Sequence, residues 1–355
     1  MTTSTEFLVD KTALRETHFA AADASILDRQ ALLRITRFAL TSNNVTYAAI
    51  GERFGYWKFF PAQPPYGRVP VWGFADVAAS KSADLAVGER VWGYFPMSSH
   101  LVVSPSKASA RGFVDGAPHR AGLPPVYNQY ERVAVDPAYR ADQENEIALF
   151  RPLFVTGFLI DDFLDENRNF DARRAMLSSA SSKTALGLAK LLHDRGKVEV
   201  VGLTSAANVD FVQRTGFYDR VVTYDEFETL PNDAPALLVD MAGDAPLINR
   251  LAERLGGAFI YNCMVGATHW HARSAQTKGP ARTAFFAPDR IVKRHKDWGS
   301  DGFASRYAAA WQGFLTESQP WLRVVERQGQ AAVRETWEAL LDGKTRPEEG
   351  YVLSL

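Results

Sequence analysis

The chain has 355 residues, with 40 basic and 41 acidic side chains and one cysteine, Cys263. This length is enough for two domains with separate cores. The balanced charge argues against nucleic acid or an anionic membrane as a partner. A single cysteine excludes an intrachain disulfide and a cysteine-rich zinc lobe. Residues 1–10 lack the pattern of a signal peptide, and no apolar run approaches the roughly 20 residues of a membrane span, so we expect a cytoplasmic protein.

The first part of the chain shows the short-period patterns of β structure. The run LLRITRFALTS (32–42) predicts a strand, and a loop rich in aromatic residues and glycine is expected over 43–67. Segments 69–80 and 87–105 are typical of strands separated by turns. These strands predict a small β barrel. Segment 107–145 has no clear period and is expected to be a long loop or insertion.

The segment 174–205 contains a strand, a turn rich in small residues, a helix and a second strand. Apolar side chains recur at i, i+3, i+4 and i+7 from Ala185 to Leu192, which is the spacing of one buried helix face. Gly196 ends this helix, and 198–203 is a near-continuous apolar run, typical of a parallel strand covered on both faces. The turn therefore opens a helix, and a helix N-terminus is a favourable site for an anion.

The turn departs from both common nucleotide motifs. Ser179–Ser182 occupies the region where G-x-G-x-x-G would place glycines. The motif G-x-x-x-x-G-K-[ST] would need glycine at Leu177 and Ser182, which leaves only Lys183 and Thr184 as matches. Three interpretations stay open from the pattern alone: a dinucleotide site, a phosphate-loop nucleotidase, and a parallel unit that binds nothing.

Helix and strand patterns continue to alternate through the rest of the chain, with short connections. Helices are expected over 149–163, 206–216, 245–257, 290–298, 307–315 and 331–341, and strands over 220–224, 235–243, 258–266, 283–288, 321–326 and 351–355. The alternation predicts a doubly wound parallel sheet of the α/β class. We expect residues 151–315 to form the nucleotide-binding domain. Residues 1–150, completed by 316–355, are expected to form the other domain.

Three segments carry a resemblance to a known superfamily. VGERVWGY (87–94) is similar to the G-[DE]-R-V-x-G segment in the N-terminal barrel of zinc-free quinone and enoyl reductases, a branch of the medium-chain dehydrogenases/reductases. Residues 237–266 resemble the signature of strand, D-x-x-G, helix and glycine-ended strand, and 337–355 resemble the closing helix and strand. More closely, the whole chain resembles the uncharacterised bacterial family DUF2855. The resemblance implies a Rossmann-type sheet plus a GroES-like β-barrel domain.

The zinc-binding residues of the superfamily are missing. Gly73, Phe74 and Ala75 stand where zinc-dependent members carry G-H-E. Because a catalytic zinc needs three protein ligands around an open position, we expect an enzyme without metal. His269 and His271 form an H-x-H pattern near Cys263 that could bind a metal, but such pairs also serve packing and hydrogen bonding on loops.

The resemblance implies NADP(H) as the cofactor. The implied contacts are Ser179, Ala180, Ser181, Ser182 and Lys183 for the pyrophosphate, Thr204, Ser205 and Asn208 for the adenosine ribose, and Tyr224, Gly243, Met264 and Val265 elsewhere. The second strand ends in VVGLTS, without the carboxylate that NAD-binding units place there. A carboxylate would repel a 2′-phosphate, so we expect NADPH to be preferred over NADH.

The resemblance also implies catalytic positions. Tyr56, in F-G-Y-W, lies where enoyl reductases carry a tyrosine proton donor in G-x-Y-P, although Trp57 replaces the proline. A phenol can protonate an enolate, but a place in an aromatic core is the other interpretation. Asn44, or its neighbour Asn43, is expected to face the nicotinamide. The expected substrate wall consists of Tyr127, Asn128 and Tyr130.

These features predict a zinc-independent, NADP(H)-dependent oxidoreductase that reduces a carbonyl, quinone, or conjugated enone or enoyl compound. The alternative is a catalytically silent relative that binds a nucleotide or a hydrophobic small molecule, or serves as a structural subunit. We expect a small-molecule substrate and no nucleic-acid or membrane partner. A homodimer is left open.

Overall fold

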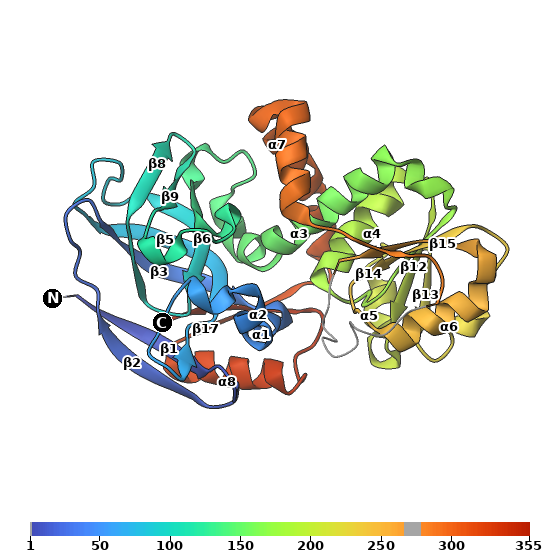
Figure 1. The fold of residues 1–355 in the computed structure, drawn as a ribbon, viewed down its shortest axis with the longest axis horizontal. Helices are drawn as coiled ribbons and strands as arrows, with labels where there is room; N and C mark the ends of the chain where they lie inside the picture. Colours follow the sequence, from blue (N-terminus) through green and yellow to red (C-terminus); the bar gives the residue numbers. More distant parts are fainter. Residues whose placement is uncertain (1, 266–277) are drawn as a thin grey trace. The chain divides into compact units, whose positions relative to one another are not determined.

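The structure is a computed structural model that describes residues 2–265 and 278–355. The chain divides into two compact units (Figure 1). Unit 1 comprises Met1–Arg151 and Leu322–Leu355, and unit 2 comprises Pro152–Trp321. None of the helices in the described ranges is long and apolar enough to cross a membrane.

Unit 1 is mostly β structure. Its strands are β1 (Thr3–Asp10), β2 (Thr17–Asp23), β3 (Ala31–Leu40), β4 (Tyr66–Gly67), β5 (Pro70–Ser80), β6 (Arg90–Pro96), β7 (His100–Val103), β8 (Pro105–Ser109), β9 (Gly112–Asp115), β10 (Gln129–Arg132), β17 (Arg323–Gln328) and β18 (Glu349–Ser354). The larger sheet has the order β17-β18-β3-β5-β6-β10-β9-β8, with β7 paired to β3. A smaller sheet has the order β2-β1-β4. The helices are α1 (Ser42–Ala49), α2 (Gly51–Phe54) and α8 (Gln330–Leu341).

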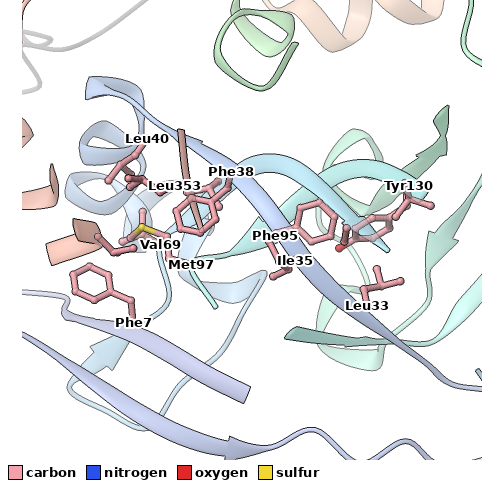
Figure 2. Close-up of a cluster of buried hydrophobic side chains, with 14 of the residues drawn as sticks. Phe7, Leu33, Ile35, Phe38, Leu40, Val69, Phe95, Met97, Tyr130 and Leu353 are labelled. Atoms are coloured by element: carbon pink, nitrogen blue, oxygen red, sulfur yellow. The ribbon is translucent and has the colours of Figure 1, made fainter. Parts of the chain in front are cut away.

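The core of unit 1 joins segments from both ends of the chain. Figure 2 shows part of it, with side chains from β1, β3, β6, β10 and β18 in one apolar cluster. The last strand enters this cluster because β18 pairs antiparallel with β3, with Tyr351 opposite Leu40. The strands β3 and β5 approach very closely at Gly73, where a Cβ atom would lie 2.1 Å from the Arg37 carbonyl oxygen. A glycine is therefore required at this position by packing alone.

Unit 2 is a parallel sheet with helices packed on it. Its strands are β11 (Arg174–Leu177), β12 (Glu199–Thr204), β13 (Arg220–Thr223), β14 (Ala236–Asp240), β15 (Phe259–Met264) and β16 (Arg282–Ala284). The helices are α3 (Glu144–Glu166), which begins in unit 1, α4 (Lys183–Arg195), α5 (Val209–Arg214), α6 (Ala245–Leu255) and α7 (Ala287–Ser318). The order is β13-β12-β11-β14-β15-β16, all parallel. Counted along the chain this is 3-2-1-4-5-6, which confirms the predicted doubly wound sheet.

The helices of unit 2 pack through apolar and small residues. The apolar face of α6 lies on β14 and β11, where Leu247 and Leu251 join Met176 and Leu238 in one buried cluster. Helix α4 packs against α3 through Gly187, where a Cβ atom would lie 2.9 Å from the Phe154 ring. This close approach explains why a glycine interrupts the apolar face of α4.

Several elements differ from the sequence prediction. Strands β1 and β2 precede the first predicted strand, and helices α1 and α2 lie where a loop was expected. Strands β9 and β10 lie within the expected loop 107–145. These elements lack a strong local period, because their burial depends on partners distant in the sequence. The two helices predicted at 290–298 and 307–315 agree with α7, which consists of two helical parts that meet at a kink at Gly299, whose φ is 71° and ψ 167°.

Candidate functional site

The strand order of unit 2 reverses between β11 and β14. In open α/β sheets the connections leave such a point in opposite directions, and ligands bind in the crevice outside the carboxyl ends of the strands. The segments that follow these two strands are Ser178–Ser182, which leads into α4, and Met241–Asp244, which leads into α6. The predicted phosphate turn therefore lies at the reversal point.

Hydrogen bonds to the neighbouring strand ends hold the β11–α4 turn in place. Ser179 has a φ of 51°, and its amide donates to the Tyr224 hydroxyl at 2.8 Å. The Ala180 amide donates to the Leu203 carbonyl oxygen at 3.0 Å, and the Tyr218 hydroxyl donates to the Ala180 carbonyl oxygen at 2.8 Å. The turn is thus folded down onto the ends of β12 and β13.

This folding requires small residues. At Gly202, in β12, a Cβ atom would lie 2.9 Å from both the Ala180 Cβ and the Tyr218 ring. The Asn208 side-chain amide donates to the Ser181 hydroxyl at 3.1 Å, so the segment after β12 is tied to the same turn. The small side chains therefore allow the turn to pack closely on β12, and they do not cover the outer side of its backbone, where a ligand could bind.

The turn ends at a capped helix start. The Ser182 hydroxyl accepts a hydrogen bond from the Ala185 amide at 3.3 Å, as an N-cap residue does. The first amides of a helix have no intrahelical acceptors, and together with the helix dipole they attract anions. Lys183 is the first residue of α4, and burial lowers the pKa of its ammonium group to about 8. A phosphate near this lysine would favour its charged form.

The turn after β14 is organised by a buried carboxylate that we did not predict as a site residue. The Ser178 hydroxyl donates to Asp240 Oδ1 at 2.9 Å, and the amides of Ala242 and Gly243 donate to the same oxygen at 3.1 and 3.0 Å. Asp240 Oδ2 is buried without a partner within residues 2–265 and 278–355, and burial raises the pKa of Asp240. The D-x-x-G pattern at 240–243 was the sequence signal for this turn. Asp240 and Ser178 set its shape.

Most of the predicted cofactor residues meet at this edge of the sheet. Met264 and Val265 end β15 next to β14, and the Val265 amide donates to the Asp240 carbonyl oxygen at 3.0 Å. At the end of β12, Ser205 is exposed, whereas Thr204 is only 1% exposed and presents no hydroxyl to solvent. No carboxylate lies in the segment 203–208. Ser205 and Asn208 offer a hydroxyl and an amide group at this strand end.

Tyr56 lies in an aromatic cluster of unit 1. It follows Gly55, whose φ is 76°, and its ring centroid is 4.5 Å from that of Tyr47 and 6.0 Å from that of Tyr127. Burial raises the pKa of Tyr56, and a hydrogen bond from Tyr127 acts in the opposite direction. Tyr56 and Tyr127 are partly exposed, whereas Tyr47 is buried. The two predicted residues Tyr56 and Tyr127 are therefore neighbours.

The Asn44 side chain stabilises the start of α1 through hydrogen bonds. It is buried at the start of α1, where its side-chain oxygen accepts from the Thr41 amide at 2.7 Å and its nitrogen donates to the Pro70 carbonyl oxygen at 2.9 Å. Asn43 is partly exposed and hydrogen-bonds with the Tyr47 hydroxyl. Of the two asparagines, Asn43 is the one adjacent to the aromatic cluster.

Asn128 and Tyr130 surround a buried ion pair. Arg120 and Asp115 have side chains only 1% exposed each and lie 3.0 Å apart. Arg120 donates to the Tyr130 hydroxyl at 3.2 Å and to Asn128 Oδ1 at 3.4 Å, and the Tyr130 hydroxyl donates to the Tyr94 carbonyl oxygen at 2.8 Å. The polar atoms of Asn128 and Tyr130 are thus used within unit 1. Of the expected substrate wall, only Tyr127 is partly exposed.

The described part of the chain contains no group of three His, Cys, Asp or Glu side chains arranged to hold a metal ion. His269 and His271 lie outside the described residues. Cys263 is buried, and burial raises the pKa of its thiol to about 12, which keeps the sulfur protonated at neutral pH.

Comparison with known proteins identifies both a family and a fold. The model of a family described as "Protein of unknown function (DUF2855)" matches residues 38–346, which confirms the resemblance drawn from the sequence. No curated protein matches the chain. CurA from Vibrio vulnificus, solved in complex with NADPH, superimposes with a TM-score of 0.58 at 13% identity, over 95% of this chain and 94% of that one.

Two further solved structures show the same likeness. A mutant form of enoyl thioester reductase from Candida tropicalis has a TM-score of 0.58 at 10% identity and full coverage of both chains. TarJ from S. aureus, in complex with NADPH, has a TM-score of 0.57 at 10% identity, over 99% of each chain. At these identities the likeness establishes the fold, and it agrees with the Rossmann-type sheet and GroES-like domain that the resemblance implied.

Proposed function

The chain belongs to the DUF2855 family, and we propose that it is an NADP(H)-dependent, zinc-independent oxidoreductase that reduces a carbonyl, quinone, or conjugated enone or enoyl compound. One observation supports the proposal most strongly. A small-residue turn and a capped helix start lie at the reversal point of a 3-2-1-4-5-6 parallel sheet, where this fold binds dinucleotides. The similar structures CurA and TarJ were solved with NADPH, which supports the same choice of cofactor.

The residues at this edge suit NADPH. In the proposal, the backbone of Ser179–Lys183 and the N-terminus of α4 hold the pyrophosphate, with the Lys183 ammonium adding positive charge. Ser205 and Asn208 donate to the 2′-phosphate, because no carboxylate lies in segment 203–208 to repel it. Contacts from Tyr224, Gly243, Met264 and Val265 complete the proposed binding set, whereas Thr204 is too deeply buried to take the part first expected of it.

Bound NADPH supplies a hydride to the substrate carbon. This chain must then provide a proton to the enolate or alkoxide that results. We assign this step to Tyr56: its Oη–H bond breaks, the proton moves to the substrate, and the phenolate takes a new proton from solvent. The hydrogen bond from Tyr127 stabilises the phenolate, which makes Tyr56 a better acid than burial alone would allow.

The proposed reaction does not use zinc. A catalytic zinc requires three protein ligands, and Phe74 stands in the position of the histidine in the G-H-E segment of zinc-dependent superfamily members. The Phe74 side chain is fully buried, and the described residues offer no substitute cluster.

The test begins with cofactor binding. NADPH is titrated into the protein while its fluorescence and the equilibrium dissociation constant are recorded, and NADPH oxidation is then followed with a panel of quinones and enones. We expect saturable binding and turnover, both unchanged by EDTA. Binding without turnover for any carbonyl substrate would favour the catalytically silent relative. Loss of activity in EDTA, restored by stoichiometric zinc, would overturn the zinc-independent mechanism.

A further inference from the structure

The two faces of the paired strands β5 and β6 have different surroundings. One face enters the apolar core of unit 1 through Val71, Val91 and Phe95. The opposite face carries Trp72, Trp92 and Tyr94, because successive side chains of a strand alternate. The rings of Tyr47, Tyr56, Phe59, Phe60 and Tyr127 pack on this second face. We call these eight residues the aromatic layer.

The rings of the aromatic layer are in close contact. Trp72 and Trp92 stack with their centroids 4.6 Å apart and their planes at 16°. The Tyr94 centroid lies 4.9 Å from that of Trp72 and 4.8 Å from that of Tyr127. Tyr127 and Tyr56 are partly exposed, so the layer reaches the surface of unit 1 at these two tyrosines.

Two hydrogen-bonding groups inside the layer have no partner. Trp92 Nε1 and Tyr94 Oη are buried and unpaired among the described residues, whereas the Trp72 side chain hydrogen-bonds with the Tyr47 hydroxyl. Elsewhere in unit 1 the same groups are satisfied: the Tyr130 hydroxyl makes two hydrogen bonds, and the Trp337 indole donates to the Leu14 carbonyl oxygen at 2.8 Å. Buried polar groups are normally paired, so two unpaired donors in one cluster indicate an acceptor supplied from outside.

The two arginines that lie over Phe60 and Trp92 of the layer are already neutralised. Arg120 lies 4.7 Å from the Phe60 ring centroid and is paired with Asp115 at 3.0 Å. Arg151 lies 4.5 Å from the Trp92 centroid and is paired with Asp136 at 2.6 Å. A carboxylate or phosphate would therefore find both of these arginines already paired, and an uncharged ligand is favoured.

We infer that the aromatic layer binds a planar, uncharged carbonyl compound conjugated to an aromatic ring, an aryl enone or a related aryl ketone. Its ring stacks on the tyrosine and tryptophan rings, and its carbonyl oxygen accepts from the unpaired donors. This inference rests on the proposed function, because the ligand is the substrate of the proposed reductase. It selects aryl-conjugated carbonyls over small aliphatic enones and over charged acyl thioesters.

The test compares three probes by equilibrium dialysis with the full-length protein, without cofactor and with saturating NADP. The probes are 4-phenylbut-3-en-2-one, cyclohex-2-en-1-one and crotonyl-CoA. We expect the aryl enone to bind at least about tenfold more tightly than either other probe, because only it offers both the ring and an uncharged carbonyl. Equal or tighter binding of cyclohexenone or crotonyl-CoA would overturn the inference.

Two variants test the donors themselves. Tyr94→Phe and Trp92→Phe remove a donor but keep a ring, and each should raise the Kd of the aryl enone about fivefold. Tyr94→Phe should leave Tm unchanged or higher, because the lost hydroxyl has no partner in the free protein. Tyr351→Phe, whose hydroxyl bonds Glu349 elsewhere in unit 1, should leave the Kd unchanged. Unchanged binding in both donor variants would show that the layer is only core.

The ligand assignment and the proposed reductase function can fail independently of each other. If the protein binds the aryl enone but not NADPH, the reductase proposal fails while the ligand assignment stands. If it binds NADPH and reduces cyclohexenone or crotonyl-CoA without any preference for the aryl enone, the ligand assignment fails and the reductase proposal stands.

Discussion

The β11–α4 turn of unit 2 and the aromatic layer of unit 1 handle their polar groups in opposite ways. In the turn, the Ser182 hydroxyl caps α4, the Ser178 hydroxyl bonds Asp240, and the Ser181 hydroxyl accepts from Asn208. In the aromatic layer, Trp92 Nε1 and Tyr94 Oη have no partner in the described ranges. These three serine hydroxyls of the turn all have partners, whereas two donors of the aromatic layer have none among the described residues.

The two regions therefore recognise different features of a ligand. A turn whose side chains hold each other presents mainly backbone amides and a helix dipole, which recognise any phosphate of the right shape. Selectivity between cofactors must then come from the adjacent strand end at Ser205. A layer with unpaired donors between aromatic rings recognises both a ring and a hydrogen-bond acceptor. It can therefore distinguish substrates that carry both groups from those that carry one. Four predictions test this division.

The largest effect is expected at the ion pair beside the aromatic layer, where Arg120 and Asp115 are both buried. Asp115→Ala leaves the buried Arg120 guanidinium without its partner, and breaking such a pair costs about 3–5 kcal/mol. We expect a clear fall in the urea midpoint of unit 1, followed by tryptophan fluorescence. Asp342→Ala is the control, since its partner Arg15 is 61% exposed, and we expect a loss below about 1 kcal/mol. Equal shifts would show that the Arg120 pair does not support unit 1.

The next effect concerns the proton donor at the edge of the layer. Tyr56→Phe keeps the ring and removes the hydroxyl, so kcat should fall by about a hundredfold or more while the Kd of NADPH stays the same. Burial holds the pKa of Tyr56 above its usual value, so the wild-type rate should not decline until the pH exceeds about 10. Full turnover in the variant would make Tyr56 part of the core only.

A smaller effect is expected at the strand end beside the turn. Ser205→Asp introduces a carboxylate where the 2′-phosphate is expected, so the preference for NADPH over NADH should fall about ten- to a hundredfold, or about 1.4–2.8 kcal/mol. Ser205→Ala is the control and should change the ratio little. The measurement is the pair of dissociation constants at fixed ionic strength. If the ratio of the two dissociation constants is unchanged in Ser205→Asp, this strand end does not determine the preference between the cofactors.

The smallest effect separates the two asparagines before the aromatic layer. Asn44→Ala removes the bonds to Thr41 and Pro70, so the free energy of unfolding should fall by about 1–2 kcal/mol with normal turnover per folded molecule. Asn43→Ala should leave stability within about 0.5 kcal/mol and lower turnover, because Asn43 bonds the Tyr47 hydroxyl beside Tyr56. If Asn44→Ala lowers turnover and Asn43→Ala lowers only stability, Asn44 is the catalytic residue of the two.

Residues close together in the sequence made the nucleotide site predictable. The helix predicted from Ala185 to Gly196 is α4, and the apolar run 198–203 is β12, because each has a strong period or a continuous apolar stretch set by burial on a sheet. The turn between β11 and α4 is contiguous, so its small residues could be recognised without knowing the fold. Asp240 could also have been predicted, because it is the first residue of the D-x-x-G pattern that lies at the site.

The aromatic layer could not be predicted in this way. Its members come from positions 47 to 127, and only the pairing of β5 with β6 and the packing of the intervening segments bring them together. The family resemblance suggested Asn44, and the polar and aromatic composition of a loop suggested Asn128 and Tyr130. The Thr41 partner of Asn44 is local, but the partners Pro70 and Arg120 became visible only with tertiary structure.

The sequence by itself determined the α/β class, the family, and the place of the phosphate turn, since these depend on local period and on the order of segments along the chain. Tertiary structure decided the order 3-2-1-4-5-6, the pairing of β18 with β3, and which buried donors lack an acceptor. The physical reason is that a hydrogen bond or a ring contact depends on where two groups meet in space. Local propensity carries no information about a partner that lies a hundred or more residues away.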